Sequence, residues 1–227
     1  MTVLLPHVTR PSVTVDMVVL TILNDALHVL LVERGAPPFL GALALPGGFV
    51  HIGPGGHNGE SLDDAAAREL VEETGLSRAQ VLLTQIGAFG TPGRDPRGRV
   101  ITVAYAALVR PEVAPFVRAG TDAAAVRWSP TSSMPHLAFD HDAIVAATLA
   151  RVRLEVDRTA MALHLAPEVF SVAELRAVFQ ILHGHTIDAG NFRRRFLRLL
   201  DDGVTELTHG ARVTSRKRAQ VFRAARR

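Results

Sequence analysis

The sequence predicts an α+β protein in which a mixed helix-and-strand domain comes first and a small helical domain follows. Segments rich in aliphatic and β-branched residues recur from residue 13 to residue 128. Long stretches without proline or glycine, preceded by helix-capping residues, dominate from residue 142 onward. The formal charge also changes sign. Residues 1–150 contain 10 basic and 14 acidic side chains, a net charge of −4, and residues 151–227 contain 15 and 8, a net charge of +7.

This charge asymmetry predicts two domains with different partners. Clustered arginine most commonly binds phosphate backbones, and a solvated basic tail that aids solubility is the alternative. The 227 residues suffice for one large domain or two modest ones. The apolar share of 48% and the charged share of 21% argue against disorder over most of the chain.

The absence of cysteine excludes disulfides, thiolate metal sites and thiol catalysis. The first residues, with Pro6 and Pro11, lack the pattern of a signal peptide. The apolar stretch 13–23 is well short of the ~20 residues that span a bilayer. We therefore expect a cytoplasmic protein without a membrane segment.

The first domain is predicted to be rich in strands. Expected strands cover residues 13–23, 27–32, 42–50, 81–89, 100–109 and 125–128. Asn24-Asp25 separates the first two as the turn of a hairpin would. A glycine-rich loop over 51–59 follows the third strand, and a charged turn joins the fourth strand to the fifth.

A helix with both ends marked is predicted over residues 62–74. Ser61 and Asp64 have the spacing of a capping box, with Asp in place of the usual Glu, and Gly75 stands at the C-cap position. At 100° per residue, its glutamates at positions 69, 72 and 73 fall within about 60° of one another. The helix therefore presents an acidic face.

An acidic helix face of this kind is expected to bind a cation. Glu69 and Glu73 repel each other at i,i+4 spacing. Arg68 stands four residues before Glu72 and can pair with it, but one arginine cannot neutralise three carboxylates. Hard oxygen ligands of this kind suit Mg²⁺ or Mn²⁺. The alternative is a solvated acidic face without a ligand.

The second part of the chain predicts helices and a hairpin. One long helix is expected over 142–165, ended by Pro167. Two further helices are expected, one capped by Ser171 and one capped by Asp188, with a glycine turn between them. Segments 204–208 and 211–214 flank His209-Gly210 as a small hairpin would. These are the elements of a winged helix. We thus expect a first domain over 1–141, a linking helix over 142–166 and a winged helix-turn-helix domain over 167–227.

The region of the glutamate helix resembles the signature of the Nudix family. Eight positions agree over 17 residues, from Glu60 through Arg68-Glu69-Leu70 and Glu72-Glu73 to Gly75-Leu76, and LPGGFV at 45–50 is also typical. The resemblance implies an α/β/α sandwich that binds Mg²⁺ (or Mn²⁺) at a diphosphate. The implied metal ligands and catalytic residues are Glu69, Glu72 and Glu73, with Arg68 holding the carboxylates in register and Gly48 and Glu60 as ligand-binding positions.

The sequence departs from this family at one place. Gly48 and Glu60 are separated by 11 residues where the family usually has five, an insertion of six in the 51–59 loop. Doubling a loop costs only ~0.6 kcal/mol of closure entropy, so the fold tolerates the insertion and its effect falls on catalytic alignment. The remaining candidates each have a functional and a non-functional interpretation. His51 and His57 either contact the ligand or are solvated side chains. Glu112 and Asp122 are either candidates for the general base or ordinary surface acids.

Residues 94–109, Trp128 and LAFDH at 137–141 resemble Nudix proteins that recognise ADP-ribose and related nucleotides. Arg94 and Arg97 are the expected phosphate ligands, because a guanidinium forks onto two oxygens, with solvated turn residues as the alternative. For Asp140 and His141, within LAFDH, the alternative is that they only cap the long helix.

Residues 170–200 resemble the C-terminal winged helix of the Nudix-related transcriptional regulators of NAD metabolism. The resemblance implies a homodimeric repressor that binds a double-stranded DNA operator and senses ADP-ribose or a related nucleotide. The expected DNA-binding residues are Arg193, Arg194, Arg195, Arg198, Arg216 and Lys217. Phe192 and Arg195 share a side of the helix, so not every arginine can face DNA. The alternative is an active hydrolase of the ADP-ribose pyrophosphatase type, which the intact glutamates favour.

Overall fold

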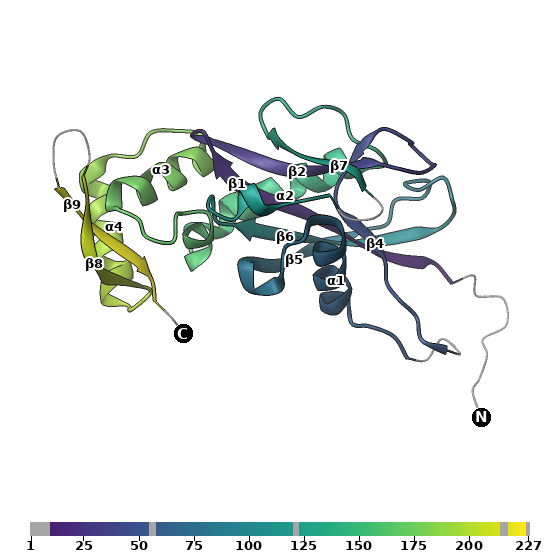
Figure 1. Cartoon of the computed structure of the whole chain (residues 1–227), viewed down its shortest axis with the longest axis horizontal. Coiled ribbons are helices and arrows are strands. Elements are labelled where there is room, and N and C mark those ends of the chain that lie inside the picture. Colours follow the sequence, from purple (N-terminus) through teal and green to yellow (C-terminus); the bar gives the residue numbers. More distant parts are fainter. Residues whose placement is uncertain (1–9, 55–57, 120–122, 214–217, 226–227) are drawn as a thin grey trace.

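The structure, a computed structural model, describes residues 10–54, 58–119, 123–213 and 218–225 (Figure 1). The strands are β1 (Ser12–Leu23), β2 (Ala26–Arg34), β3 (Leu43–Ala44), β4 (Gly47–Phe49), β5 (Val81–Phe89), β6 (Val100–Val109), β7 (Ala123–Pro130), β8 (Thr205–Val213) and β9 (Arg218–Ala224). The α-helices are α1 (Leu62–Thr74), α2 (His141–Glu155), α3 (Val172–His183) and α4 (Ala189–Asp201). The 3₁₀ turns are η2 (Arg78–Gln80), η3 (Ala114–Phe116) and η4 (Ala160–His164).

One mixed sheet forms the first domain. Its main strand order is β3-β2-β1-β6-β5, with β4 added to β1 and β7 to β2. The pairing of β1 with β6 is parallel and the other pairings are antiparallel. Asn24 and Asp25 have φ angles of 48° and 58°, as both central residues of a tight two-residue hairpin turn require. The predicted β1–β2 hairpin is confirmed.

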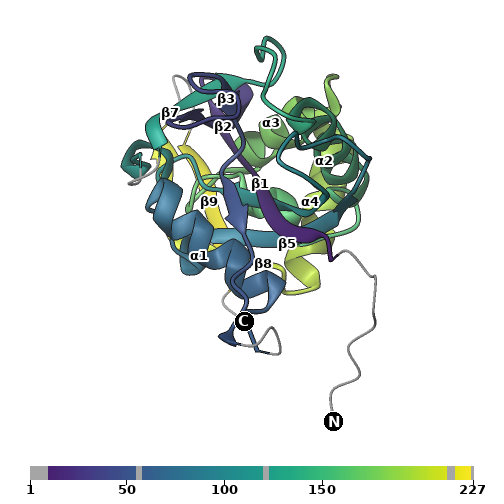
Figure 2. The same ribbon diagram turned by 90° about the vertical axis from the view of Figure 1, so that its right-hand side faces the viewer.

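Helices cover both faces of this sheet, α1 on one side and α2 on the other (Figure 2). Successive side chains of β1 point to opposite faces of the sheet, so both faces need a covering helix. Met17 and Val19 point to the face where they pack with Leu70 of α1. Val18 and Leu20 belong to the core on the opposite face, which α2 completes. Each fully buried side chain of this size stabilises the fold by about 1.5–3 kcal/mol. The predicted α/β/α sandwich is confirmed.

The second domain packs α3 and α4 against the β8–β9 hairpin at the other end of the molecule (Figure 1). Its core is aromatic: the ring centroids of Phe179 and Phe192 lie 5.2 Å apart, and those of Phe196 and Phe222 4.7 Å apart. Phe170 and Phe222 exchange backbone hydrogen bonds of 2.9 and 2.8 Å, which tie the hairpin to the segment before α3. The predicted winged helix is confirmed.

The predicted helix over 142–165 is wrong in its second half. The helix α2 ends at Glu155, and η4 follows after a turn. Thr159 makes the break: its hydroxyl donates to the Glu155 carbonyl at 3.0 Å and accepts from the backbone amide of Met161 at 3.2 Å. Absence of proline and glycine permits a helix, but side-chain capping decides where it ends.

Two predicted strand boundaries also change. The segment 42–50 forms two short strands interrupted at Pro46, which has no amide proton for the ladder. In the wing, His209-Gly210 lies inside β8, where the register with β9 shifts between Leu207 and Ala211. The glycine therefore accompanies an irregularity within a strand. The hairpin strands are 205–213 and 218–224 instead of 204–208 and 211–214.

Candidate functional site

Arg68 lies at the centre of the glutamate cluster. Its Nε and Nη2 donate to the two carboxylate oxygens of Glu60 at 3.0 and 2.6 Å. Its Nη1 donates to Glu69 at 2.7 Å and to Glu72 at 3.0 Å. Hydrogen bonding to Arg68 lowers the pKa of Glu60 to about 2, and burial raises the pKa of Glu69. One guanidinium thus holds three carboxylates in register.

Two adjacent glycines fit this cluster closely. A Cβ at Gly48 would collide with the Glu69 carboxylate, so the side chain of Glu69 lies directly against the glycine backbone. The backbone amide of Gly47 donates to Glu73 Oε2 at 2.9 Å. The LPGGFV loop and α1 therefore position each other through the glutamates that the sequence singled out.

The donor chemistry of these glutamates suits Mg²⁺, because all candidate ligands are hard carboxylate oxygens. Glu69 and Glu72 point to Arg68, and Glu73 points to the amide of Gly47. Within the described ranges, no three Asp, Glu or His side chains converge as ligands of one ion. Binding an ion between them requires the carboxylates to turn from these partners.

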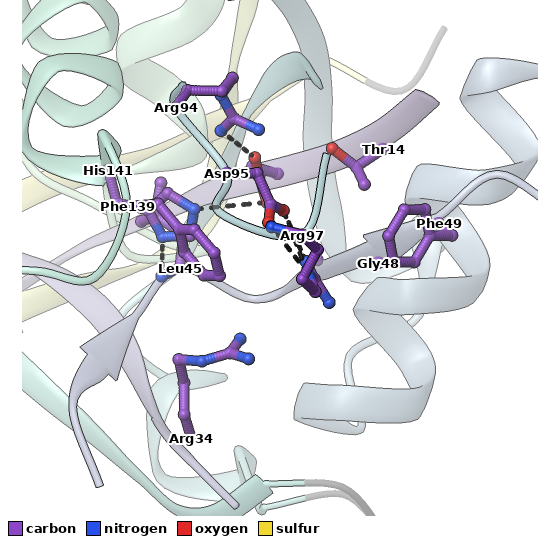
Figure 3. Close-up of a pocket in the computed structure, with 12 residues that line it drawn as sticks. Thr14, Arg34, Leu45, Gly48, Phe49, Arg94, Asp95, Arg97, Phe139 and His141 are labelled. Carbon is purple, nitrogen blue, oxygen red and sulfur yellow. Dashed lines mark hydrogen bonds and ion pairs between the residues drawn. The ribbon is translucent and has the colours of Figure 1, made fainter. Parts of the chain in front are cut away.

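A pocket of about 160 Å³ opens beside β4 and the start of α2 (Figure 3). It is lined by Thr14, Asp16, Arg34, Leu45, Gly47, Gly48, Phe49, Arg94, Asp95, Arg97, Phe139 and His141. The pocket therefore shares both glycines of the LPGGFV loop with the glutamate cluster.

Two arginines of the pocket flank one aromatic ring. The guanidinium carbons of Arg34 and Arg97 lie 4.8 and 5.6 Å from the ring centroid of Phe139, and that of Arg97 lies 5.0 Å from the ring of Phe49. Asp95 holds Arg97 with bonds of 3.0 and 2.7 Å. Arg34 bonds only to backbone carbonyls among the described contacts, Pro38 O at 2.7 Å being the nearer, and burial together with Arg97 lowers its pKa.

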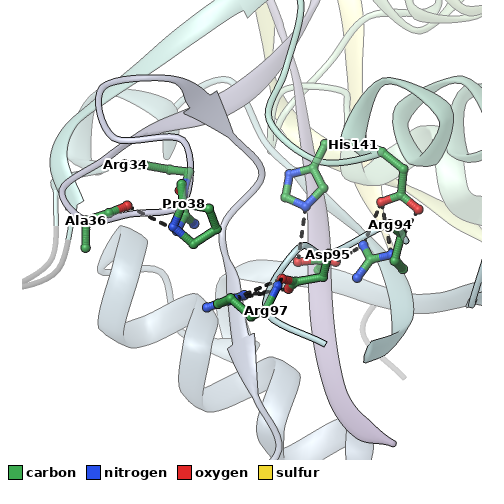
Figure 4. Close-up of polar contacts among 9 residues, drawn as sticks. Arg34, Ala36, Pro38, Arg94, Asp95, Arg97 and His141 are labelled. Carbon is green, nitrogen blue, oxygen red and sulfur yellow. Dashed lines mark hydrogen bonds and ion pairs between the residues drawn. The ribbon is translucent and has the colours of Figure 1, made fainter. Parts of the chain in front are cut away.

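Arg94, the other expected phosphate ligand, forms ion pairs with carboxylates of the protein itself (Figure 4). Its side chain is only 4% exposed. It donates to Asp140 from Nε at 2.9 Å and from Nη2 at 2.6 Å, and to Asp16 at 3.3 Å. The structure thus gives Arg94 the role of fixing the start of α2 to the pocket wall.

The side chains of Asp140 and His141 bond to the pocket wall instead of capping α2. Asp140 occupies the N-cap position, but its side chain makes no capping bond and pairs with Arg94 instead. His141 Nδ1 accepts from the backbone amide of Leu45 at 2.9 Å, so the ring proton lies on Nε2, which is 3.7 Å from Asp16 Oδ1. Burial lowers the pKa of His141 and keeps this ring neutral.

The expected DNA-binding arginines of α4 divide into two groups. Arg193, Arg194 and Arg198 are exposed. Arg195 instead turns to the linker, where its Nη1 donates to Asp157 Oδ1 at 2.5 Å, and its guanidinium lies 4.3 Å from the ring centroid of Phe179. The structure brings Arg195 to a domain junction.

The other residues proposed from the sequence either lie outside the described residues or do not line the pocket. Arg216, Lys217, His57 and Asp122 lie outside the described residues. His51 is exposed, and its backbone amide donates to Glu60 at 2.7 Å. Glu112 accepts from the backbone amide of Glu168, in the segment before α3, at 3.1 Å. Sequence reasoning missed Arg34 and Asp16, which lie on strands β2 and β1 and have no motif of their own. It also missed Asp95, which lies in the 94–109 segment but was given no role.

Two family models match the chain. The NUDIX domain model matches residues 13–150, and the model of the NrtR DNA-binding winged helix domain matches residues 162–224. Together with the sandwich, the glutamate helix and the hairpin module, these matches define a Nudix domain followed by a winged helix domain.

Similar proteins narrow the class. The ADPR responsive transcriptional repressor NtrR of Acinetobacter baylyi is 31% identical over 217 residues, 95% of this chain and 82% of the relative. An ADP-ribose pyrophosphatase of Methanocaldococcus jannaschii is 36% identical over 136 residues, 60% of this chain and 72% of the relative. The chain belongs to the NrtR family of Nudix-related transcriptional regulators.

Solved structures agree with this family. The crystal structure of Shewanella oneidensis NrtR complexed with a 27mer DNA matches with a TM-score of 0.76 and 31% identity over 93% of each chain. The NUDIX domain of Shewanella oneidensis NrtR complexed with ADP ribose matches with a TM-score of 0.52 and 30% identity, over 64% of this chain and 90% of that one. The family and fold predicted from the sequence are confirmed.

Proposed function

We propose that this protein is a DNA-binding repressor of NAD-related metabolism whose Nudix domain binds ADP-ribose or a closely related nucleotide. One geometric observation carries the proposal. The helix α2 begins in the pocket wall with Asp140 and His141, and the turn after it holds Arg195 of α4 through Asp157. A ligand in the pocket and DNA on α4 therefore act on opposite ends of one helix.

The pocket supports binding of an anionic nucleotide. Arg34 and Arg97 place two positive charges around Phe139, and a diphosphate accepts the forked hydrogen bonds that guanidiniums donate. Because ~300 Å³ is the lower end for sites that enclose a small molecule, the pocket takes part of the nucleotide and the rest extends over Phe49 toward α1. The similarity to an ADPR responsive repressor and to a NUDIX domain complexed with ADP ribose supports this ligand class.

We assign the metal ligands as the sequence predicted them: Glu69, Glu72 and Glu73 hold Mg²⁺ or Mn²⁺ in this proposal. A bound ion would neutralise the diphosphate and acidify a coordinated water. Arg68 positions Glu69 and Glu72 and offsets their charge in the absence of an ion. Gly48 provides the space that the Glu69 carboxylate occupies.

DNA binding is assigned to the second domain. Arg193, Arg194 and Arg198 are exposed on α4, and Arg216 and Lys217 remain predictions from the sequence. The similarity to an NrtR complexed with a 27mer DNA supports this partner. In the proposal the protein acts as a cytoplasmic homodimer, with the Nudix domain over 1–141, the linking segment over 142–166 and the DNA-binding domain over 167–227. No helix of the described chain is long and apolar enough to cross a membrane.

The test is binding of the purified full-length protein to labelled duplexes tiled across the DNA upstream of its own and neighbouring genes. Fluorescence anisotropy at fixed, near-physiological salt is suitable, because phosphate contacts make affinity steeply salt-dependent. We expect one or a few duplexes to bind much more tightly than shuffled sequences of the same composition. Equal, weak binding to all duplexes would refute a sequence-selective repressor.

The second candidate function is hydrolysis of ADP-ribose to AMP and ribose 5-phosphate. The complete glutamate set and the similarity to an ADP-ribose pyrophosphatase favour it. Incubation with ADP-ribose and Mg²⁺, followed by chromatographic detection of AMP, tests it directly. Turnover that disappears in Glu73→Gln would establish the hydrolase, whether or not the protein also binds DNA.

A further inference from the structure

The turn after α2 and the helix α4 face each other across a groove of about 390 Å³. Asp157 and Arg158 line it from the turn, and Arg195 and Arg198 line it from α4. The groove therefore lies between the linker and α4, the helix that we propose binds DNA.

The charges around this groove are unevenly compensated. Asp157 accepts hydrogen bonds from Arg195 at 2.5 Å and from His183 Nε2 at 3.2 Å, so its charge is already balanced. Arg158 and Arg198 are exposed, and neither forms an ion pair within the described part of the chain. Asp202, at the end of α4, is the other acid of the groove. Two uncompensated guanidiniums thus face one carboxylate.

This groove continues the exposed face of α4. Arg194 and Arg198 are four residues apart, which places them within about 40° of each other around the helix. Arg198 therefore belongs both to the exposed arginine face and to the groove that Arg158 lines. An anionic backbone that follows the arginine face passes next to the linker.

We infer that the DNA-contacting surface extends beyond the winged helix domain onto the linker, where Arg158 binds a backbone phosphate of double-stranded DNA beside Arg198. The inference rests on the proposed DNA binding. A guanidinium and a phosphate form charge-assisted, forked hydrogen bonds, and such contacts position a protein on DNA without selecting its sequence. Arg158 thus adds affinity on all sequences alike.

The experiment compares the full-length wild type with Arg158→Ala and with Arg127→Ala. Arg127 is the matched control, because it is an exposed arginine without an ion pair in the described structure and lies on β7, which pairs with β2 in the sheet of the first domain (Figure 1). Anisotropy is measured with the tightest upstream duplex and with a shuffled duplex, each over a series of salt concentrations. Thermal unfolding of each variant verifies the fold.

We expect Arg158→Ala to weaken both duplexes by ~10-fold, the effect of one charge-assisted contact. The slope of log affinity against log salt should fall by about 0.9, the value for one lost phosphate contact. Arg127→Ala should match the wild type. An unchanged slope in Arg158→Ala, with or without weaker binding, overturns the inference. Failure of the wild type to bind any upstream duplex selectively counts against the proposed function instead.

Discussion

Arg195 on α4 donates a hydrogen bond of 2.5 Å to Asp157 in the turn after α2, so the winged helix domain is attached to the helix that starts in the wall of the pocket lined by Arg34 and Arg97. A second bond joins Arg195 Nη2 to the Asp157 carbonyl at 2.9 Å. Burial alone would raise the pKa of Asp157, but its hydrogen bonds to Arg195 and His183 outweigh burial and lower that pKa. The pair is thus fully charged at neutral pH.

Asp157→Asn should uncouple the two domains. Because the pair is partly exposed, we expect the free energy of unfolding to fall by only about 0.5–1 kcal/mol. We expect ADP-ribose to release the DNA, and this release should weaken more clearly in the variant, since the contact that we propose transmits it is lost. Urea denaturation and anisotropy measure the two effects. Glu155→Gln, which breaks the i,i+4 pair between Arg151 and Glu155 on α2 at 3.2 Å, is the control. Equal behaviour of the two variants would argue against a coupling role for Asp157.

Glu60→Gln should change stability in a defined pH range. The folded-state pKa of Glu60 is about 2, mainly because Arg68 donates to its carboxylate, against ~4.3 in the unfolded chain. A depressed pKa stabilises the fold above ~4.3, and this contribution disappears as the pH falls toward 2. We expect the variant to lose about 1–3 kcal/mol at pH 7 and to depend less on pH between 4 and 2. Denaturation at several pH values measures this, with Asp201→Asn on the exposed side of α4 as the control.

Replacing Arg94 and replacing Arg97 should affect stability and ligand binding to different degrees. The side chain of Arg94 is 4% exposed and that of Arg97 is 42% exposed. Removing Arg94 leaves Asp140 and Asp16 without their partner, so Arg94→Ala should destabilise the protein by about 3–5 kcal/mol. Arg97→Ala leaves the buried Asp95 carboxylate without its guanidinium partner, so it should cost about 1–3 kcal/mol of stability, and it should weaken ADP-ribose binding by ~10-fold or more.

Thermal unfolding and isothermal titration calorimetry separate these two roles. Arg99→Ala, at an exposed arginine just after the same turn, serves as the control for ligand binding. Normal ADP-ribose affinity in Arg97→Ala would remove Arg97 from the proposed phosphate site.

Mutating Arg193 and Arg194 together to Ala should abolish selective DNA binding, because both are exposed near the start of α4. Nucleotide affinity should stay at the wild-type level, since the pocket lies in the other domain. Anisotropy and calorimetry on the same preparation give both values. Loss of both activities would contradict the division of labour between the domains.

Much of the architecture follows from local sequence signals. The strands β5 and β6 have the predicted limits, because their aliphatic runs are bounded by turn residues. The caps of α1 and α3 form as expected, with Ser61 accepting from the Asp64 amide at 3.1 Å and Ser171 from the Glu174 amide at 3.2 Å. Caps and turns of this kind depend on residues only a few positions apart, so the sequence alone is enough to predict them.

The polar network of the pocket could not be predicted in the same way. Arg94 is followed closely by Asp95 and Arg97, yet it pairs with Asp140, 46 positions later, and with Asp16, 78 positions earlier. Neither Asp140 nor Asp16 stands at a spacing from Arg94 that belongs to a known motif. The folded sheet alone brings the three side chains together. Arg34 was missed for the same reason, because its relation to Phe139 depends on how β2 and the start of α2 approach each other.

The most direct test of the account is the effect of ADP-ribose on the complex of the full-length protein with its tightest upstream duplex, measured by anisotropy at fixed salt. A ligand shifts such an equilibrium only by its difference in affinity for the two states. The account predicts that ADP-ribose releases the DNA in a saturable manner, and that AMP or ribose 5-phosphate alone does so far less. DNA binding that stays unchanged at ADP-ribose concentrations that saturate the pocket in calorimetry would contradict it.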